Sequence, residues 1–229
     1  GTVRDDRGRQ SRPASRATAG GRSDVLIRAL KAIVWGMAHA YGWVLARLAG
    51  RMGFAHASVW VGQIRTPFGE MVRQAFYRRT LRSVGTDCRF FYGCNFSCPD
   101  IRVGDHARVG YGTHVGQVDI GADTLIGAYC SLISGNRIHG IGRTDIPIRL
   151  QPGEQRRVTI GRDCMIGVHA IVLADLGEGA VVGAGAVVTR PIPPWSVAVG
   201  NPARVIRSRQ NVMKDAGVPE HGAPGDDLP

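Results

Sequence analysis

A six-residue period runs from about Val84 to Val188 and limits what this chain can fold into more than any other feature. Large apolar residues recur at positions 84, 90, 96, 103, 109, 115, 120, 126 and 132, and again at 160, 166, 172, 176, 182 and 188. An α-helix repeats its buried face every 3.6 residues and a β-strand every two, so neither explains a period of six. The period predicts an all-β solenoid, in which each coil has three flat faces and each face buries one large side chain.

Two other positions of the repeat unit are small. Glycine directly follows the inward residue at 104, 110, 116, 121, 127, 161, 167 and 183. We expect these glycines to give a tight corner its backbone freedom. The fifth position is small and holds four of the five cysteines, which are Cys88, Cys94, Cys130 and Cys164. We therefore expect these thiols to be buried packing residues and neither zinc ligands nor disulfides.

The rest of the chain divides by composition. Residues 1–22 carry six arginines among Pro, Ser and Gly, which predicts a disordered basic arm, and residues 208–229 are predicted to be a disordered tail. The net charge is +11, but no nucleic-acid-binding motif accompanies it, so we expect no nucleic-acid partner. No cleavable signal sequence is visible, and the expected location is the cytoplasm.

Residues 23–82 are predicted to form a helical segment before the repeat at 83–207. Its apolar part contains an uncharged run of 15 residues, 32–46, whereas a simple transmembrane helix needs about 20. Three placements stay open: packed against protein, lying in the membrane interface, or spanning the membrane. The basic arm upstream favours the interface on the cytoplasmic face, with aromatic side chains at headgroup depth.

A second helix is expected within this segment from about Gly69 to Ser83. Its apolar residues fall largely on one side and its arginines largely elsewhere, as in an amphipathic helix that covers a core. It leads directly into the first repeat. We therefore expect it to cap the first coil.

The closing repeats resemble those of a known family. Residues 182–190 (VGAGAVVTR) and 199–207 (VGNPARVIR) are similar to the last coils of the left-handed β-helix acyltransferases, such as galactoside, maltose and serine O-acetyltransferases. A YRRTL-like helix and an SGxxxHG loop make the chain most similar to exopolysaccharide-type sugar O-acetyltransferases. The resemblance covers about residues 70–207. It implies a left-handed parallel β-helix, a homotrimer and acetyl-CoA or another acyl-CoA as co-substrate, without a metal.

The resemblance also implies where CoA binds. The family contacts the pantetheine arm through backbone atoms, the adenosine end through a Thr-Lys pair, and it carries a basic pair near the C-terminus. The matching residues here are Val168 and Ala184, Thr189 and Arg190, and Arg204 and Arg207. Arginine suits this place because its planar fork pairs with phosphate oxygens. Met165 stands where many relatives have tryptophan, so it is the expected wall of the CoA groove.

The six-residue rhythm breaks once for a long insertion between Leu132 and Thr159, and such insertions commonly line a functional face. Transfer of an acyl group from a thioester to a hydroxyl needs a base, and the insertion contains His139, whose imidazole suits that role. Asn136 would take the catalytic place under a shifted alignment, but an amide cannot act as the base. Asp145 is a candidate to orient His139, and His114 to contact the substrate.

The main functional prediction is therefore acetyl transfer to a saccharide hydroxyl in polysaccharide or glycoconjugate synthesis. A lipid-linked saccharide is included among the expected acceptors. N-acylation of an amino-sugar is an alternative that the residues do not separate from it. A zinc carbonic anhydrase on the same coil would need three converging histidines, and the closely spaced pair is missing. A non-catalytic scaffold is a further alternative, disfavoured because the CoA-binding positions and the loop histidine occur together.

Overall fold

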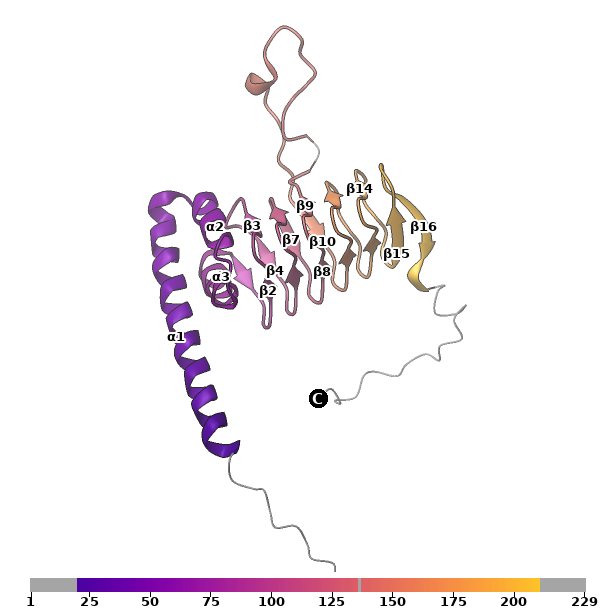
Figure 1. Ribbon diagram of the computed structural model, residues 1–229. Helices are drawn as coiled ribbons and strands as arrows, with labels where there is room; N and C mark the ends of the chain where they lie inside the picture. Colours follow the sequence, from indigo (N-terminus) through magenta and orange to yellow (C-terminus); the bar gives the residue numbers. More distant parts are fainter. Residues whose placement is uncertain (1–19, 136, 211–229) are drawn as a thin grey trace, which may run out of the picture.

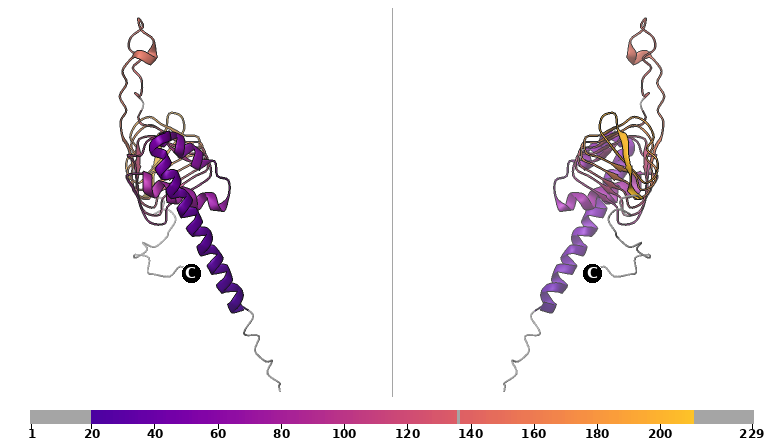
Figure 2. Two further views of the ribbon diagram at one scale, coloured as in Figure 1. Left: turned by 90° about the vertical axis from the view of Figure 1, so that its left-hand side faces the viewer. Right: turned by 90° about the vertical axis from the view of Figure 1, so that its right-hand side faces the viewer.

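The computed structural model describes residues 20–135 and 137–210. Three helices, α1 (Gly20–Met52), α2 (Phe54–Gly62) and α3 (Pro67–Thr80), precede a series of short strands. Figure 1 shows the helices at one end of a long solenoid and an antiparallel strand pair at the other. Figure 2 shows the coils end-on, and in its left-hand view they stack behind α1.

The strands form three faces that run the length of the coil. Face A consists of β1 (Ser83–Val84), β4 (Arg102–Val103), β7 (Val118–Ile120) and β10 (Val158–Ile160). Face B consists of β2 (Arg89–Phe90), β5 (Arg108–Val109), β8 (Leu125–Ile126), β11 (Met165–Ile166), β13 (Val181–Val182), β15 (Ser196–Val199) and β16 (Arg204–Ser208). Face C consists of β3 (Asn95–Phe96), β6 (His114–Val115), β9 (Ser131–Leu132), β12 (Ile171–Val172) and β14 (Val187–Val188).

Neighbouring strands on each face are parallel and in register, apart from the final β15–β16 pair, which is antiparallel. Bridges at Leu176 and Ile192 extend face A beyond β10, so the solenoid makes about six turns. Every predicted inward residue from Phe90 to Val188 is at most 4% exposed. The period of six is thus confirmed as the packing rule of the core.

The four cysteines at the fifth position are buried and free, as predicted. Burial raises the pKa of the Cys94 thiol to about 12. Cys98, the one cysteine outside that position, is partly buried. These thiols fill small spaces inside the coil.

The expected role of the repeat glycines is wrong. None of the eight glycines after the inward residue has a positive φ; the left-handed backbone lies two residues later, at the fourth position of the unit. Its non-glycine occupants are Asp87, His106, Asp123, Tyr129, Asp163, His169 and Trp195. The eight glycines are needed for another reason, because a Cβ there would lie 2.3 to 2.8 Å from atoms of the next coil.

Close approach between coils makes a stability prediction. A Cβ on Gly121 would lie 2.5 Å from the backbone nitrogen of Arg162, so Gly121→Ala should lower the free energy of unfolding by about 1–3 kcal/mol through overpacking. A Cβ on Gly142, in the insertion, meets nothing within 4 Å, and Gly142→Ala should leave stability unchanged or slightly higher. Thermal or denaturant unfolding measures both. Equal stability of the two variants would contradict the steric argument.

Helix α3 caps the first coil, as predicted, although it begins and ends two to three residues earlier. Thr66 is its N-cap, accepting from the backbone N–H of Gly69 at 3.1 Å, and Pro67 opens the helix instead of preceding it. Arg73 is buried and donates to the backbone oxygens of Phe90 and Ile64, both at 2.8 Å. These bonds fasten the helix to the start of the solenoid.

Helix α1 begins at Gly20 and packs on α3. The sequence did not predict the separate helix α2, which starts after Gly53, a residue with φ of 83°. Among the described helices, none combines the length and apolarity that crossing a bilayer requires. The predicted basic arm and tail lie outside the described residues, except for 20–22 in α1 and 208–210 after the last coil.

Candidate active site

The insertion, residues 133–157, separates β9 from β10 in the sequence, but the stacking of the coils continues past it. Strand β9 of face C ends at Leu132, and β10 continues face A beside β7, with Val158 opposite Val118 and Ile160 opposite Ile120. Figure 1 shows the insertion as a narrow excursion that leaves the coil on one side. It therefore springs from the corner between faces C and A.

Backbone hydrogen bonds close the neck of the insertion. Ser134 accepts from the backbone N–H of Gln117 through its hydroxyl at 2.8 Å, and from the N–H of Arg156 through its carbonyl at 3.0 Å. The next residue, Gly135, has a φ of 85° and is buried. A left-handed conformation at this point favours glycine and turns the chain outward.

The two arms of the insertion then run side by side. A Cβ on Gly153 would lie 1.9 Å from the carbonyl oxygen of Ile138, so the arms touch. Further out, the buried Gln151 amide donates to the carbonyl of Arg143 at 2.6 Å and accepts from its N–H at 3.0 Å. The backbone on each side of His139 is thus held by contacts with the other arm of the insertion.

His139 itself is exposed and lines a cavity of about 580 Å³ in the arms. The other lining residues are Arg137, Gly140, Ile141, Pro152, Gly153 and Glu154. Among the described residues, no side chain forms a hydrogen bond or ion pair with its ring. The imidazole is therefore open to a substrate that enters this cavity.

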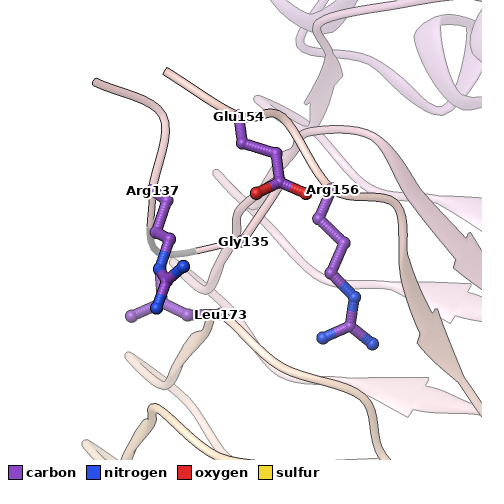
Figure 3. Close-up of a pocket in the computed structure, with 5 residues that line it drawn as sticks. All are labelled: Gly135, Arg137, Glu154, Arg156 and Leu173. Carbon is purple, nitrogen blue, oxygen red and sulfur yellow. The ribbon is translucent and has the colours of Figure 1, made fainter. Parts of the chain in front are cut away.

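A second cavity of about 230 Å³ lies at the neck, lined by Gly135, Arg137, Glu154, Arg156 and Leu173. Figure 3 shows the side chains of Arg137 and Arg156 extending from opposite arms, with the Glu154 carboxylate on the Arg156 side. Arg156 also pairs with Asp175. The sequence prediction missed Arg137, Glu154 and Arg156; their only signal was their position near His139 or on the returning arm.

Asp145 is not brought to His139. Its carboxylate pairs with Arg143, two residues away, and the hydrogen bond from that guanidinium lowers the pKa of Asp145. Both side chains are exposed. Asn136, the alternative under a shifted alignment, lies outside the described residues.

His114 lies on face C in β6, half-buried, where its Nδ1 is 2.7 Å from the Asn95 side-chain oxygen on the preceding coil. Burial lowers the pKa of His114, which favours the neutral imidazole. If Nδ1–H donates to Asn95, Nε2 is left as an acceptor. His114 lines neither loop cavity, and the sequence prediction missed its partner Asn95.

The structure brings Val168 and Ala184 together at the corner between faces B and C. The backbone N–H of Gly185 donates to the carbonyl of Val168 at 2.9 Å, and a Cβ on Gly167 would lie 2.4 Å from the Ala184 nitrogen. Both predicted residues are exposed. This corner therefore presents backbone and small side chains to solvent.

Thr189 and Arg190 lie at the other edge of face C, at the corner that carries the insertion. The coils stack there through the N–H of Ile133 to the carbonyl of Val172 and the N–H of Leu173 to the carbonyl of Val188, each 2.9 Å. Thr189 directly follows Val188. The neck cavity and the Thr189–Arg190 pair thus share one corner.

The remaining predicted CoA residues lie elsewhere. Arg204 and Arg207 are exposed on β16, which closes face B. Met165 is exposed on face B, between Leu125 and Val181 of the neighbouring coils. The two corners of face C are separated within one chain by the width of that face, which β12 and β14 cross with two strand residues each.

In the described residues 20–135 and 137–210, no group of three or more His, Cys, Asp or Glu side chains is arranged to hold a metal ion. His106, His114 and His139 lie on different parts of the coil and insertion. The site described by this geometry is therefore an imidazole, two guanidinium groups and a carboxylate on the insertion, beside exposed corners of the coil.

The repeat of this chain resembles that of known proteins. Residues 157–190 match the family model described as the hexapeptide repeat of succinyl-transferase. A probable acetyltransferase of Mycobacterium tuberculosis is 34% identical over 115 residues, which cover 48% of this chain and 38% of that protein. The bifunctional protein GlmU of Rubrobacter xylanophilus is 32% identical over 118 residues, covering 51% of this chain and 22% of that protein. The chain thus spans well under half the length of these curated relatives.

Among solved structures, the hexapeptide-repeat-containing acetyltransferase of Vibrio cholerae, crystallised with acetyl-CoA, superposes with a TM-score of 0.58 at 23% identity. The match covers 72% of this chain and 87% of that one. Together with the repeat match, it confirms the predicted fold, a left-handed parallel β-helix with N-terminal helices. The resemblance to hexapeptide-repeat acyltransferases is likewise confirmed, without distinguishing sugar O-acetyltransferases among them.

Proposed function

We propose that this hexapeptide-repeat β-helix transfers an acetyl or other short acyl group from acyl-CoA to a saccharide hydroxyl, in polysaccharide or glycoconjugate synthesis. One observation carries the proposal. The long insertion of the coil is braced by its own hydrogen bonds and presents the His139 imidazole, which pairs with no described side chain, to a cavity above the corner that carries Thr189 and Arg190.

His139 is the proposed general base. Its imidazole removes the proton of the acceptor hydroxyl while the oxygen attacks the thioester carbonyl carbon. The tetrahedral intermediate then collapses, the carbon–sulfur bond breaks, and the proton returns from the imidazolium to the CoA thiolate. The thioester is already activated, so no acyl-enzyme is needed. Backbone N–H groups of the coil are the proposed partners of the oxyanion.

The coil supplies the proposed CoA site. Exposed Val168 and Ala184 form a cradle of backbone and small side chains for the pantetheine arm. Arg190, Arg204 and Arg207 are exposed cations suited to the phosphates of CoA. Thr189 stands with Arg190 at the adenosine end, and Met165 supplies a flexible apolar wall in place of tryptophan.

A homotrimer completes this site. Within one chain the insertion and the Val168–Ala184 cradle lie at opposite edges of face C, and the proposal places the thioester between neighbouring chains. Around a threefold axis, the insertion of one copy meets the cradle of the next, and three equivalent sites form. The proposal thus makes the active site a property of two neighbouring subunits.

The acceptor binds at the cavities of the insertion. Arg137, Arg156 and Glu154 offer donors and an acceptor for hydroxyl or phosphate groups of a saccharide, including a lipid-linked one. The neutral His114, held by Asn95, is a proposed further contact to the substrate on face C. A hydroxyl and an amino group of the acceptor both fit this arrangement. The product distinguishes them, because a hydroxyl gives an ester and an amino group gives an amide.

Acetyl transfer is tested by incubating the full chain with acetyl-CoA and a panel of mono- and oligosaccharides, free and lipid-linked. We expect CoA thiol release that depends on the acceptor and a product with one added acetyl group by mass spectrometry. The O-acetyl ester should be cleaved by mild alkali. An alkali-stable amide would establish N-acylation instead, and the absence of acetyl-CoA binding would contradict the proposal as a whole.

A further inference from the structure

Helix α1 is the outermost layer at the N-terminal end of the solenoid. Helix α3 packs on the first strands of the coil, and α1 packs on α3. In the left-hand view of Figure 2, α1 lies across the end of the coils and continues beyond their outline. One side of this 33-residue helix therefore faces away from the rest of the chain.

That outer side is apolar along most of its length. Large side chains recur there at spacings of three and four residues, and their exposure falls from 71% at Leu26 to 38% at Leu48. The stripe consists of Leu26, Leu30, Ile33, Met37, Tyr41, Val44 and Leu48. The small residues Ala38, Gly42 and Ala49 lie about a third of a turn around the helix from this stripe and are buried against the cap. The exposed stripe is the side that a water-facing helix would make polar.

The side of α1 that borders α3 is also apolar where the two helices part. A cavity of about 600 Å³ there is lined by Leu30, Lys31, Ala32, Val34, Trp35 and Met71, almost entirely through apolar atoms. The N-terminal half of α1 is thus apolar both along its stripe and along the side that borders α3. Apolar surface on this scale marks an interaction site.

The charge around this surface is strongly positive. Residues 20–82 contain ten arginines and lysines but only two acidic residues, Asp24 and Glu70. Glu70 is already paired with Arg89 of the first coil. Residues 1–19 add five arginines and two aspartates in sequence. A partner of this face should therefore offer both an apolar layer and negative charge.

We propose that the outer face of α1 docks on an anionic lipid surface, with the helix lying in the plane of the membrane and the solenoid axis pointing away from it. The apolar stripe enters the acyl boundary, and Tyr41, a member of the stripe, lies at headgroup depth. The Arg47 guanidinium stacks on Trp43 with its centre 4.8 Å from the ring, which places a cation beside that aromatic. This inference is independent of the acyl-transfer chemistry.

A second copy of the chain fits the same stripe less well. Pairing of two copies along the stripe would bring together two α1 helices that each carry five basic residues and one acidic residue. Like charges at such an interface oppose association, whereas anionic headgroups attract them. The charge pattern therefore favours lipid over self-association.

Vesicle co-sedimentation of the full chain tests the proposal. We expect binding to phosphatidylcholine vesicles that contain phosphatidylserine, weaker binding without it, and a decrease as salt is raised. The variant Leu30→Gln/Ile33→Gln/Met37→Gln removes three exposed side chains that do not support the fold. Its affinity for anionic vesicles should fall at least about tenfold.

The matched control is Leu125→Gln/Ile148→Gln/Leu150→Gln, which changes three comparably exposed apolar residues outside α1. It should bind vesicles as the unmodified chain does. No binding of the unmodified chain to anionic vesicles, or equal binding by the α1 variant, would overturn the proposal. A lower oligomeric mass of the α1 variant in light scattering, without vesicle binding by the parent, would assign the stripe to contacts between copies.

Discussion

Replacing His139 with alanine is expected to lower kcat for acetyl transfer about 10²- to 10⁴-fold, the range associated with losing a general base. The side chain is exposed and is held by no other described side chain, so its removal should leave the solenoid and the insertion folded. CoA thiol release measures the rate, and thermal unfolding checks the fold. Binding of acetyl-CoA should persist, because the proposed CoA contacts lie on the coil.

His106→Asn is the matched control for this experiment. His106 is exposed, pairs with Asp123 at 2.9 Å, and adopts φ of 57°, a conformation that asparagine tolerates. Its turnover should equal that of the parent. If His139→Ala kept full turnover while His114→Gln lost it, the base would be His114, whose neutral imidazole already has a hydrogen-bonded partner in Asn95.

The solenoid could be predicted because its packing rule is local. Within each run the inward residues recur every six residues, and the same stacking continues after the insertion, where Ile160 pairs with Ile120. The glycines show where such reasoning stops. Their positions are visible in sequence, but whether Gly121 serves a positive φ or a close approach depends on how tightly the next coil packs.

The site could be predicted only for residues whose place is set by their position in the repeat. Val168 and Ala184 lie together because they are neighbours in successive coils, which the repeat already encodes. Arg156 could not be placed beside Arg137, because the arms meet through contacts such as Gly153 with Ile138. The position of Asp145 in the insertion did not reveal its contact with Arg143, two residues away.

The N-terminal helices were the least predictable part for a physical reason. Helix α1 is apolar on nearly every side, so its sequence lacks the one-sided pattern that tells which face is buried. Only the packing of Ala38, Gly42 and Ala49 identifies the inner face. The stripe is then identified as an exposed apolar face of α1, and the partner of this face is inferred from charge.

Ala184→Trp is expected to raise the Kd for CoA at least about 100-fold, because an indole would fill the cradle through which the pantetheine arm approaches the backbone. The Ala184 side chain is exposed at its corner, so the coil should fold and unfold as the parent does. Calorimetric titration with CoA measures the affinity. Val168 forms the cradle with it, and the exposed Ile206 on β16 offers a control substitution, Ile206→Trp, outside it. Unchanged affinity in Ala184→Trp would place CoA elsewhere.

The same variant can show whether each active site spans two subunits. Chains carrying Ala184→Trp and chains carrying His139→Ala are both inactive in homotrimers, for different reasons. When they are co-expressed with different tags and mixed trimers are isolated through both tags, every such trimer has one interface where an intact His139 meets an intact cradle on its neighbour. About one third of the parental turnover per trimer should return. A site contained within one chain would give none, because no chain in the mixture is intact.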